Sequence, residues 1–200
     1  PLMKTTASLK VLFLACSLIP AFAFGASYIE TVNGEISGNR LAPTLFTLDP
    51  GANTLSGTVI TGDVDYLTFN IPVGFKFQSL TLDSYTGTGT LTKSFIGMQS
   101  GTTFTVTPAA AQPADMLGYT HYGPTGVQGE ILDDIGTGSG AQGFTPPLAA
   151  GNYTFWIQET GSQARNYTFT MTMTAVPEPS VLLLVTLGMG VVIFRRRRRV

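Results

Sequence analysis

The sequence predicts an all-β fold, an antiparallel β-sandwich or jelly roll, for a single domain that spans residues 27–175. Several short segments alternate apolar and polar residues with a period of two, and Gly-rich turns separate them. No stretch of this region keeps a helical period for long. The abundance of Thr and aromatic residues agrees with the prediction, because these residues favour exposed β-sheet.

The earliest clear strand is predicted over residues 66–71, where the apolar side chains at odd-numbered positions share one face. A turn at 72–74 ends it. In the next segment the apolar residues change parity between Phe77 and Leu80, so we expect a β-bulge around residues 78–79.

The other strands are predicted from the same alternation. Turns are expected at residues 87–89 and 99–101. The strands are expected at residues 90–98, 102–107, 153–158 and 167–174. In the last of them, Tyr, Phe and Met side chains would point inward and a column of threonines outward.

The segment 109–148 differs from the rest of the body. It is rich in Gly, Pro, Ala and Gln. It runs for about forty residues without firm periodicity, whereas connections between strands or helices rarely exceed about 12–15 residues. We expect a long loop with one strand near Met116–Tyr122, and any binding function is sought there first.

The body is acidic. Residues 27–175 contain four basic and eleven acidic side chains, a net charge of −7, although the whole chain has a formal charge of −1. An acidic body argues against nucleic acid as a partner, because phosphates are bound by basic surfaces.

Asp63 and Asp65 are the candidate metal ligands. In an extended strand, side chains two residues apart share a face, and calcium is bound by several carboxylate and carbonyl oxygens. Asp133 and Asp134 would supply further oxygens from the long loop. The alternative is that the Asp63 side chain caps the turn at residues 61–62, and then no cofactor is expected.

The sequence lacks a convincing active site, so we expect a non-enzymatic protein. His121 is the single histidine, and no serine stands in a nucleophile-elbow sequence. One histidine also cannot form a multi-histidine zinc site. Glu130 with Asp133 or Asp134 would give the two carboxylates of a glycosidase, but any acidic protein contains such pairs.

Residues 1–26 have the pattern of a secretory signal peptide, with an N-terminal signal helix. Lys4 and Lys10 form a positive region before the apolar run at 11–19, and Ala21 and Ala23 occupy the two positions that a signal peptidase reads. The alternative is an uncleaved N-terminal anchor.

Residues 176–200 combine a Pro-Glu-Pro sequence, an apolar run and a basic end. The prolines lack amide donors and end any preceding strand. Residues 181–194 carry no charge and predict one transmembrane helix. The helix is short, because a full span needs about 20 apolar residues. By the positive-inside rule the arginines form a cytoplasmic stop, made of Arg195, Arg196, Arg197, Arg198 and Arg199.

This tail resembles the C-terminal sorting tail of PEP-CTERM proteins, the substrates of exosortase-type enzymes. The resemblance implies a body in the periplasm, a single pass through the inner membrane, and processing that delivers the body to the cell surface or outside the cell. It also implies a Gram-negative bacterium that makes extracellular polysaccharide, which becomes a candidate partner. The alternative is a plain membrane anchor. The resemblance assigns recognition by the exosortase to Val176, Pro177, Glu178, Pro179 and Ser180.

The body resembles the bacterial pre-peptidase C-terminal type of β-sandwich. The resemblance is carried by the segments 62–69, 148–155 and 166–169. It implies an exported accessory module, and it says more about fold than about function.

Together these features predict an exported cell-envelope protein with a structural or adhesive role in the surface or extracellular matrix. The alternative is a carbohydrate- or calcium-binding module on a plain anchor. Trp156 would stack on a sugar if its face of the sheet is exposed, or else it is buried under the long loop.

Overall fold

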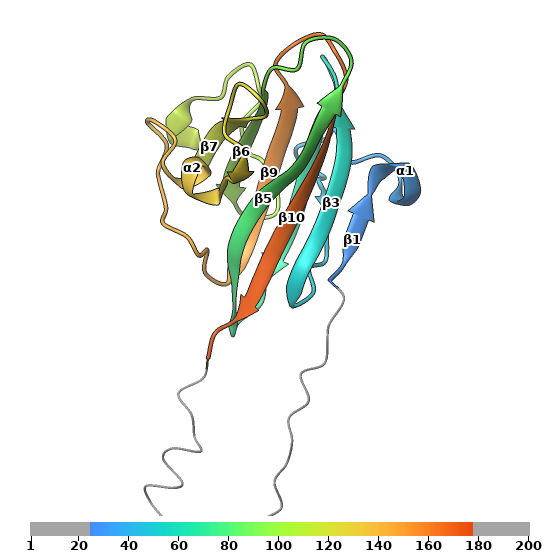
Figure 1. The fold of residues 1–200 in the computed structure, drawn as a ribbon. Coiled ribbons are helices and arrows are strands. Elements are labelled where there is room, and N and C mark those ends of the chain that lie inside the picture. The colour runs from blue at the N-terminus through green and yellow to red at the C-terminus, as the bar shows by residue number, and fades with distance from the viewer. Residues whose placement is uncertain (1–24, 178–200) are drawn as a thin grey trace, which may run out of the picture.

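The computed structural model describes residues 25–177, and within that range ten strands form two sheets packed face to face (Figure 1). One sheet has the order β1 (Ser27–Ile29), β3 (Gly51–Val59), β10 (Arg165–Ala175), β5 (Phe75–Gly87) and β8 (Gly129–Glu130). The other has the order β2 (Thr44–Leu45), β4 (Val64–Ile71), β9 (Gly151–Glu159), β6 (Ser94–Ser100) and β7 (Gly118–Tyr122). The prediction of an all-β sandwich is confirmed.

Helices are short in the described part of the chain. They are α1 (Glu30–Asn33), the 3₁₀ turn η1 (Pro113–Asp115) and α2 (Leu132–Gly136). No helix within residues 25–177 is both long and apolar enough to cross a membrane. The predicted signal helix and the predicted transmembrane helix at 181–194 lie outside this range.

The core lies between the two sheets. The ring of Phe69, on β4, lies 5.1 Å from the rings of both Phe77 and Phe155, measured between centroids. Phe169 and Met171 enter from β10 and are fully buried. Each such side chain stabilises the fold by about 1.5–3 kcal/mol relative to exposure to water.

Strand β5 contains the predicted β-bulge. Its pairing with β10 skips Gln78, between Phe77 and Ser79. A second skip occurs at Asp83, where the core-facing residues change parity again, from Leu82 to Tyr85. The two bulges allow a 13-residue strand to bend along the sandwich while its apolar side chains stay on the core side.

Two pairings are parallel, so the prediction of a wholly antiparallel sandwich is corrected. Strand β1 runs parallel to β3, and β2 runs parallel to β4. Both β1 and β2 are edge strands of two or three residues. The chain crosses from one sheet to the other between β1 and β2, and crosses back between β2 and β3. Neither β1 and β3 nor β2 and β4 are joined by a hairpin, and parallel neighbours require such crossover connections.

The predicted strand at 102–107 is wrong, and β6 begins four residues later than expected. Phe104 is buried, and its backbone N–H donates to the carbonyl oxygen of Arg40 at 2.9 Å. Nη1 of Arg40 in turn donates to the carbonyl oxygens of Phe104 and Thr105. The backbone groups of this segment are therefore satisfied outside any strand ladder.

The segment 109–148 has more structure than a loop. The strand predicted near Met116–Tyr122 is confirmed as β7, and η1, β8 and α2 also lie in this segment. Ile131, Leu132 and Ile135 are completely buried in the main core. The segment therefore covers one side of the sandwich instead of decorating it.

Strand β10 is central, because it pairs with β3 on one side and β5 on the other. Its predicted alternation is confirmed: the Tyr, Phe and Met side chains are buried and the threonines between them are half-buried. The two ends of the described chain leave the body at the same end (Figure 1).

Candidate functional site

The predicted sorting tail starts directly at the end of the central strand. Ala175 pairs with Phe75, and the backbone N–H of Val176 donates to the carbonyl oxygen of Gly74 at 2.8 Å. Pro177 is the last described residue. The body therefore holds the chain up to Val176, with no free spacer before the Pro-Glu-Pro sequence.

The remaining predicted tail and leader sites fall outside the described residues. These are the signal-peptidase positions Ala21 and Ala23, the recognition residues Glu178, Pro179 and Ser180, and the arginine stop at 195–199.

The β4–β5 turn lies beside the point where the tail leaves the body. The turn at residues 72–74 is formed as predicted, with Gly74 at a φ of +87°. The side chain of Val73 is 92% exposed. The body therefore presents an apolar tip beside the start of the tail.

Asp65, the second of the two predicted metal ligands, is buried on β4. Its Oδ2 accepts a hydrogen bond of 2.7 Å from the phenol of Tyr167, and its Oδ1 has no hydrogen-bond partner among the described residues. Burial raises the pKa of Asp65 to about 8, and the negative charges of Glu30, Asp63 and Glu35 add to the increase, while the Tyr167 hydrogen bond opposes it. A lone carboxylate in this position is costly to ionise.

Asp63, the other predicted ligand, lies in the turn before β4 and is half-buried. Burial and the nearby charge of Glu35 raise its pKa, and the backbone N–H of Val64 lowers it. Asp133 and Asp134 lie on α2, on the other side of the body from α1 (Figure 1). The aspartates expected to supply further oxygens are therefore not brought to Asp65.

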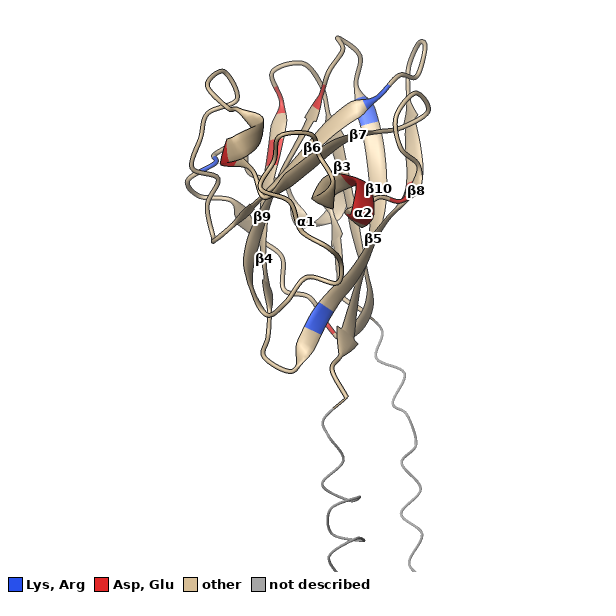
Figure 2. Cartoon of the chain, turned by 90° about the vertical axis from the view of Figure 1, so that its left-hand side faces the viewer, with Lys and Arg blue, Asp and Glu red and all other residues tan. Residues whose placement is uncertain are grey.

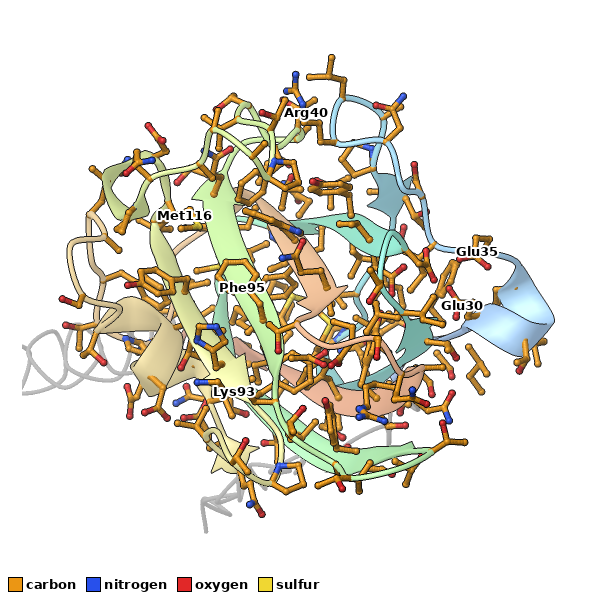
Figure 3. The ribbon with its side chains drawn as sticks, turned by 90° about the horizontal axis from the view of Figure 1, so that it is seen from above. Glu30, Glu35, Arg40, Lys93, Phe95 and Met116 are labelled. Atoms are coloured by element: carbon orange, nitrogen blue, oxygen red, sulfur yellow. The ribbon has the colours of Figure 1, made fainter. Side chains whose placement is uncertain are left out.

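The structure instead brings Glu30 and Glu35 to Asp65. One carboxylate oxygen from each of these three side chains lies within 4.8 Å of the others. Oε1 of Glu30 accepts from the backbone N–H of Ile36 at 3.2 Å, and Oε2 accepts from that of Thr58 at 2.7 Å. Figure 3 shows Glu30 and Glu35 beside each other at the side of the body that carries α1.

Glu30 and Glu35 were not predicted as ligands, because the local turn that joins them is hard to recognise in the sequence. Helix α1 is a single turn, and the N–H of Gly34 closes it onto the carbonyl oxygen of Glu30 at 3.0 Å. Gly34 has a φ of +97°, a conformation that favours glycine and reverses the chain. The Asn33-Gly34 pair between two glutamates was the available signal.

Trp156 is buried, so the sugar-stacking hypothesis is wrong. It is 4% exposed, and its ring packs against Phe95, Phe104 and Tyr66. Met116, from the long segment, completes this second small core. The alternative interpretation, burial under the long segment, is the correct one.

The other catalytic candidates are far from forming a constellation. His121, on β7, packs edge-on against Phe95 of β6, and burial together with the charge of Lys93 lowers the pKa of His121. Glu130 uses Oε1 to accept the backbone N–H groups of Leu80 and Leu132. These contacts are structural.

Three shallow hollows lie on the described surface. Each is bordered by a single carboxylate side chain, which is Asp83, Asp115 or Glu30. None of these three hollows offers the pair of facing carboxylates that glycoside hydrolysis requires.

Charged residues are sparse over the body, and the basic ones are few (Figure 2). Within the described part of the chain, one ion pair is formed, between Nε of Arg165 and Oε2 of Glu159 at 3.9 Å. The acidic group around Asp65 is therefore not neutralised by a basic side chain of residues 25–177.

Comparison with known proteins identifies the tail and finds no match for the body. Residues 175–199 match the PEP-CTERM protein-sorting motif. No curated protein and no solved structure matches the chain. The resemblance of the body to pre-peptidase C-terminal sandwiches is therefore supported by no relative. The motif implies a C-terminal sorting signal on an exported protein that an exosortase processes.

Proposed function

We propose that this protein is a structural or adhesive component of the cell envelope, whose β-sandwich is delivered to the cell surface or extracellular matrix. The match of residues 175–199 to the sorting motif carries the delivery part of this proposal. In the proposed route, a signal peptidase removes the leader, the tail holds the chain in the inner membrane, and an exosortase then releases the body.

The body's construction supports a role without catalysis. Glu130 is bound to backbone N–H groups, His121 is packed against an aromatic ring, and the three hollows on the described surface are shallow. A sandwich of two sheets, with one side covered by the segment 109–148, suits a module that presents a surface. Extracellular polysaccharide is the partner we propose for that surface, because the route suggested by the tail leads into such a matrix.

The position of the tail bears on where the body lies before processing. Because Val176 is hydrogen-bonded to Gly74, the motif is held directly against the body. We propose that the body remains next to the membrane, with the Val73 turn toward it, until the exosortase acts.

The proposed route is tested by the intact mass and fractionation of the protein in an exosortase-containing host. Pro177, Glu178 and Pro179 are changed together to alanine, and Pro124→Ala, at an exposed loop proline, serves as the control. We expect a mature mass ending near Pro177, found outside the cell, for the wild type and the control. The triple variant should stay in the membrane with its arginines. If wild type also keeps its arginines in the membrane, the tail is a plain anchor.

A further inference from the structure

We infer that Glu30, Glu35 and Asp65 form a binding site for one calcium ion. This inference concerns the body alone and holds whether or not the tail is processed. It differs from the sequence expectation, which paired Asp65 with Asp63.

The spacing of the three carboxylates fits calcium. Two oxygens bound to one ion at about 2.4 Å are at most about 4.8 Å apart, and calcium binds oxygens at about 2.3–2.6 Å. One oxygen from each of Glu30, Glu35 and Asp65 meets that limit with the others. Magnesium requires about 2.0–2.1 Å and near-octahedral geometry and usually keeps several waters, so a group of three protein carboxylates suits calcium better.

The buried oxygen of Asp65 requires a partner. Asp65 has no exposed surface, and its Oδ1 receives no hydrogen bond within the described part of the chain. An unpaired polar atom in this position costs about 1–3 kcal/mol, and more when the group is charged. A cation between the three carboxylates would satisfy this oxygen and offset the mutual repulsion of the three negative charges.

Two of the three ligands are already oriented. The N–H groups of Ile36 and Thr58 fix the Glu30 carboxylate, and Tyr167 fixes that of Asp65. These contacts use both oxygens of Glu30 once and one oxygen of Asp65, and each carboxylate keeps further lone pairs for a metal. Such second contacts hold ligands in place before the ion arrives.

The third ligand keeps the site open. The side chain of Glu35 is exposed, whereas Glu30 is half-buried. Calcium takes six to eight oxygens, so water would complete its shell from the side of Glu35. The nearby charge of Asp63 adds attraction without contributing one of the three clustered oxygens.

The site is tested by calorimetric titration of calcium into the full chain, purified in detergent micelles and freed of metal with EDTA. We expect one calcium ion per chain. Glu35→Gln should weaken binding by about ten-fold or more, because it removes one of three charged ligands and calcium affinity depends on the number of such ligands. This substitution is at an exposed position, so the fold should survive it.

Two matched variants test whether Asp63 or Asp133 belongs to the calcium ligands. Asp63→Asn removes a neighbouring charge but no clustered ligand, and should weaken binding by less than about three-fold because the charge acts through solvent. Asp133→Asn, on α2, should leave binding unchanged. The proposal is overturned if the wild type binds no calcium at millimolar concentration, as when the carboxylates share only protons. It is also overturned if Glu35→Gln binds like wild type, or if Asp63→Asn is as damaging as Glu35→Gln.

Discussion

The phenol of Tyr167 donates a hydrogen bond of 2.7 Å to Oδ2 of Asp65 and thereby joins the inner faces of the two sheets. Tyr167 lies on β10 and Asp65 on β4, and both are buried. The ring of Tyr167 passes over Gly57 on β3, where an added Cβ would lie 2.5 Å from the phenolic oxygen. A polar link thus sits where an all-β core is usually apolar.

Tyr167→Phe should destabilise the protein by about 1–3 kcal/mol, because both oxygens of Asp65 would then lack a partner in the protein. Urea denaturation of the wild type and variant measures the difference. Tyr119→Phe is the matched control, since the phenol of Tyr119 bonds an exposed carbonyl oxygen, that of Ser139. Equal stability of Tyr167→Phe and wild type would contradict the importance of the link.

The metal-free protein should lose stability as pH rises from about 4 to about 8. The pKa of Asp65 is raised to about 8 in the fold, by burial first and then by Glu30, Asp63 and Glu35, against the Tyr167 hydrogen bond. Between the unfolded and folded pKa values, only the folded state carries this proton, so each added pH unit favours unfolding by up to about 1.4 kcal/mol.

Denaturation in EDTA at several pH values measures this slope. Asp65→Asn, which mimics the protonated side chain, should flatten it. A wild-type stability that rises through this pH range would contradict the prediction.

Arg165→Met should destabilise the protein by about 3–5 kcal/mol, because it leaves the buried carboxylate of Glu159 without its cation. The guanidinium also donates to the carbonyl oxygens of Thr88 and Thr90, at 2.6 and 2.9 Å, and so holds the turn after β5. Thermal unfolding compares it with Lys93→Met, an exposed control. A loss no greater than that of the control would show that the buried pair contributes nothing.

A flexible insertion of Gly-Gly-Ser between Ala175 and Val176 should speed processing of the tail. The hydrogen bond from Val176 to Gly74 holds the motif against the body, and a spacer would free it for an enzyme. The rate of appearance of the mature form, followed by pulse labelling, measures the effect. The same insertion after Pro108, in an exposed turn, should change nothing; an equal rate for both insertions would show that the body does not hinder access.

The strands with apolar side chains on one face could be predicted from the sequence, and β3 could not. The inward positions of β3 include Asn53 and Gly57 beside Leu55 and Val59, so the apolar alternation is interrupted. Asn53 is buried because its side chain bonds the backbone around it, including the carbonyl oxygen of Met171 at 3.1 Å. Hydrogen bonding and a close aromatic contact replace hydrophobicity there.

The candidate metal site was only partly predictable for a related reason. A spacing of two residues indicates a shared face for Asp63 and Asp65 only if both lie in the strand, and β4 begins at Val64. The ligands that accompany Asp65 come instead from a turn some thirty residues earlier, and the contact depends on tertiary packing of that turn against the sheets. Pairings over such a distance leave no periodic signal in one sequence.

The place of β10 in its sheet sets the order of events during synthesis and export. β3 and β5 are neighbours only through β10, which is the last of the described strands in the chain. Until residues 165–175 have emerged from the ribosome or a translocation channel, that sheet has a gap at its centre and the sandwich cannot close. The sheet can therefore be completed only when the residues directly before the sorting motif at 175–199 are available, so completion of the fold and exposure of the motif are linked in time.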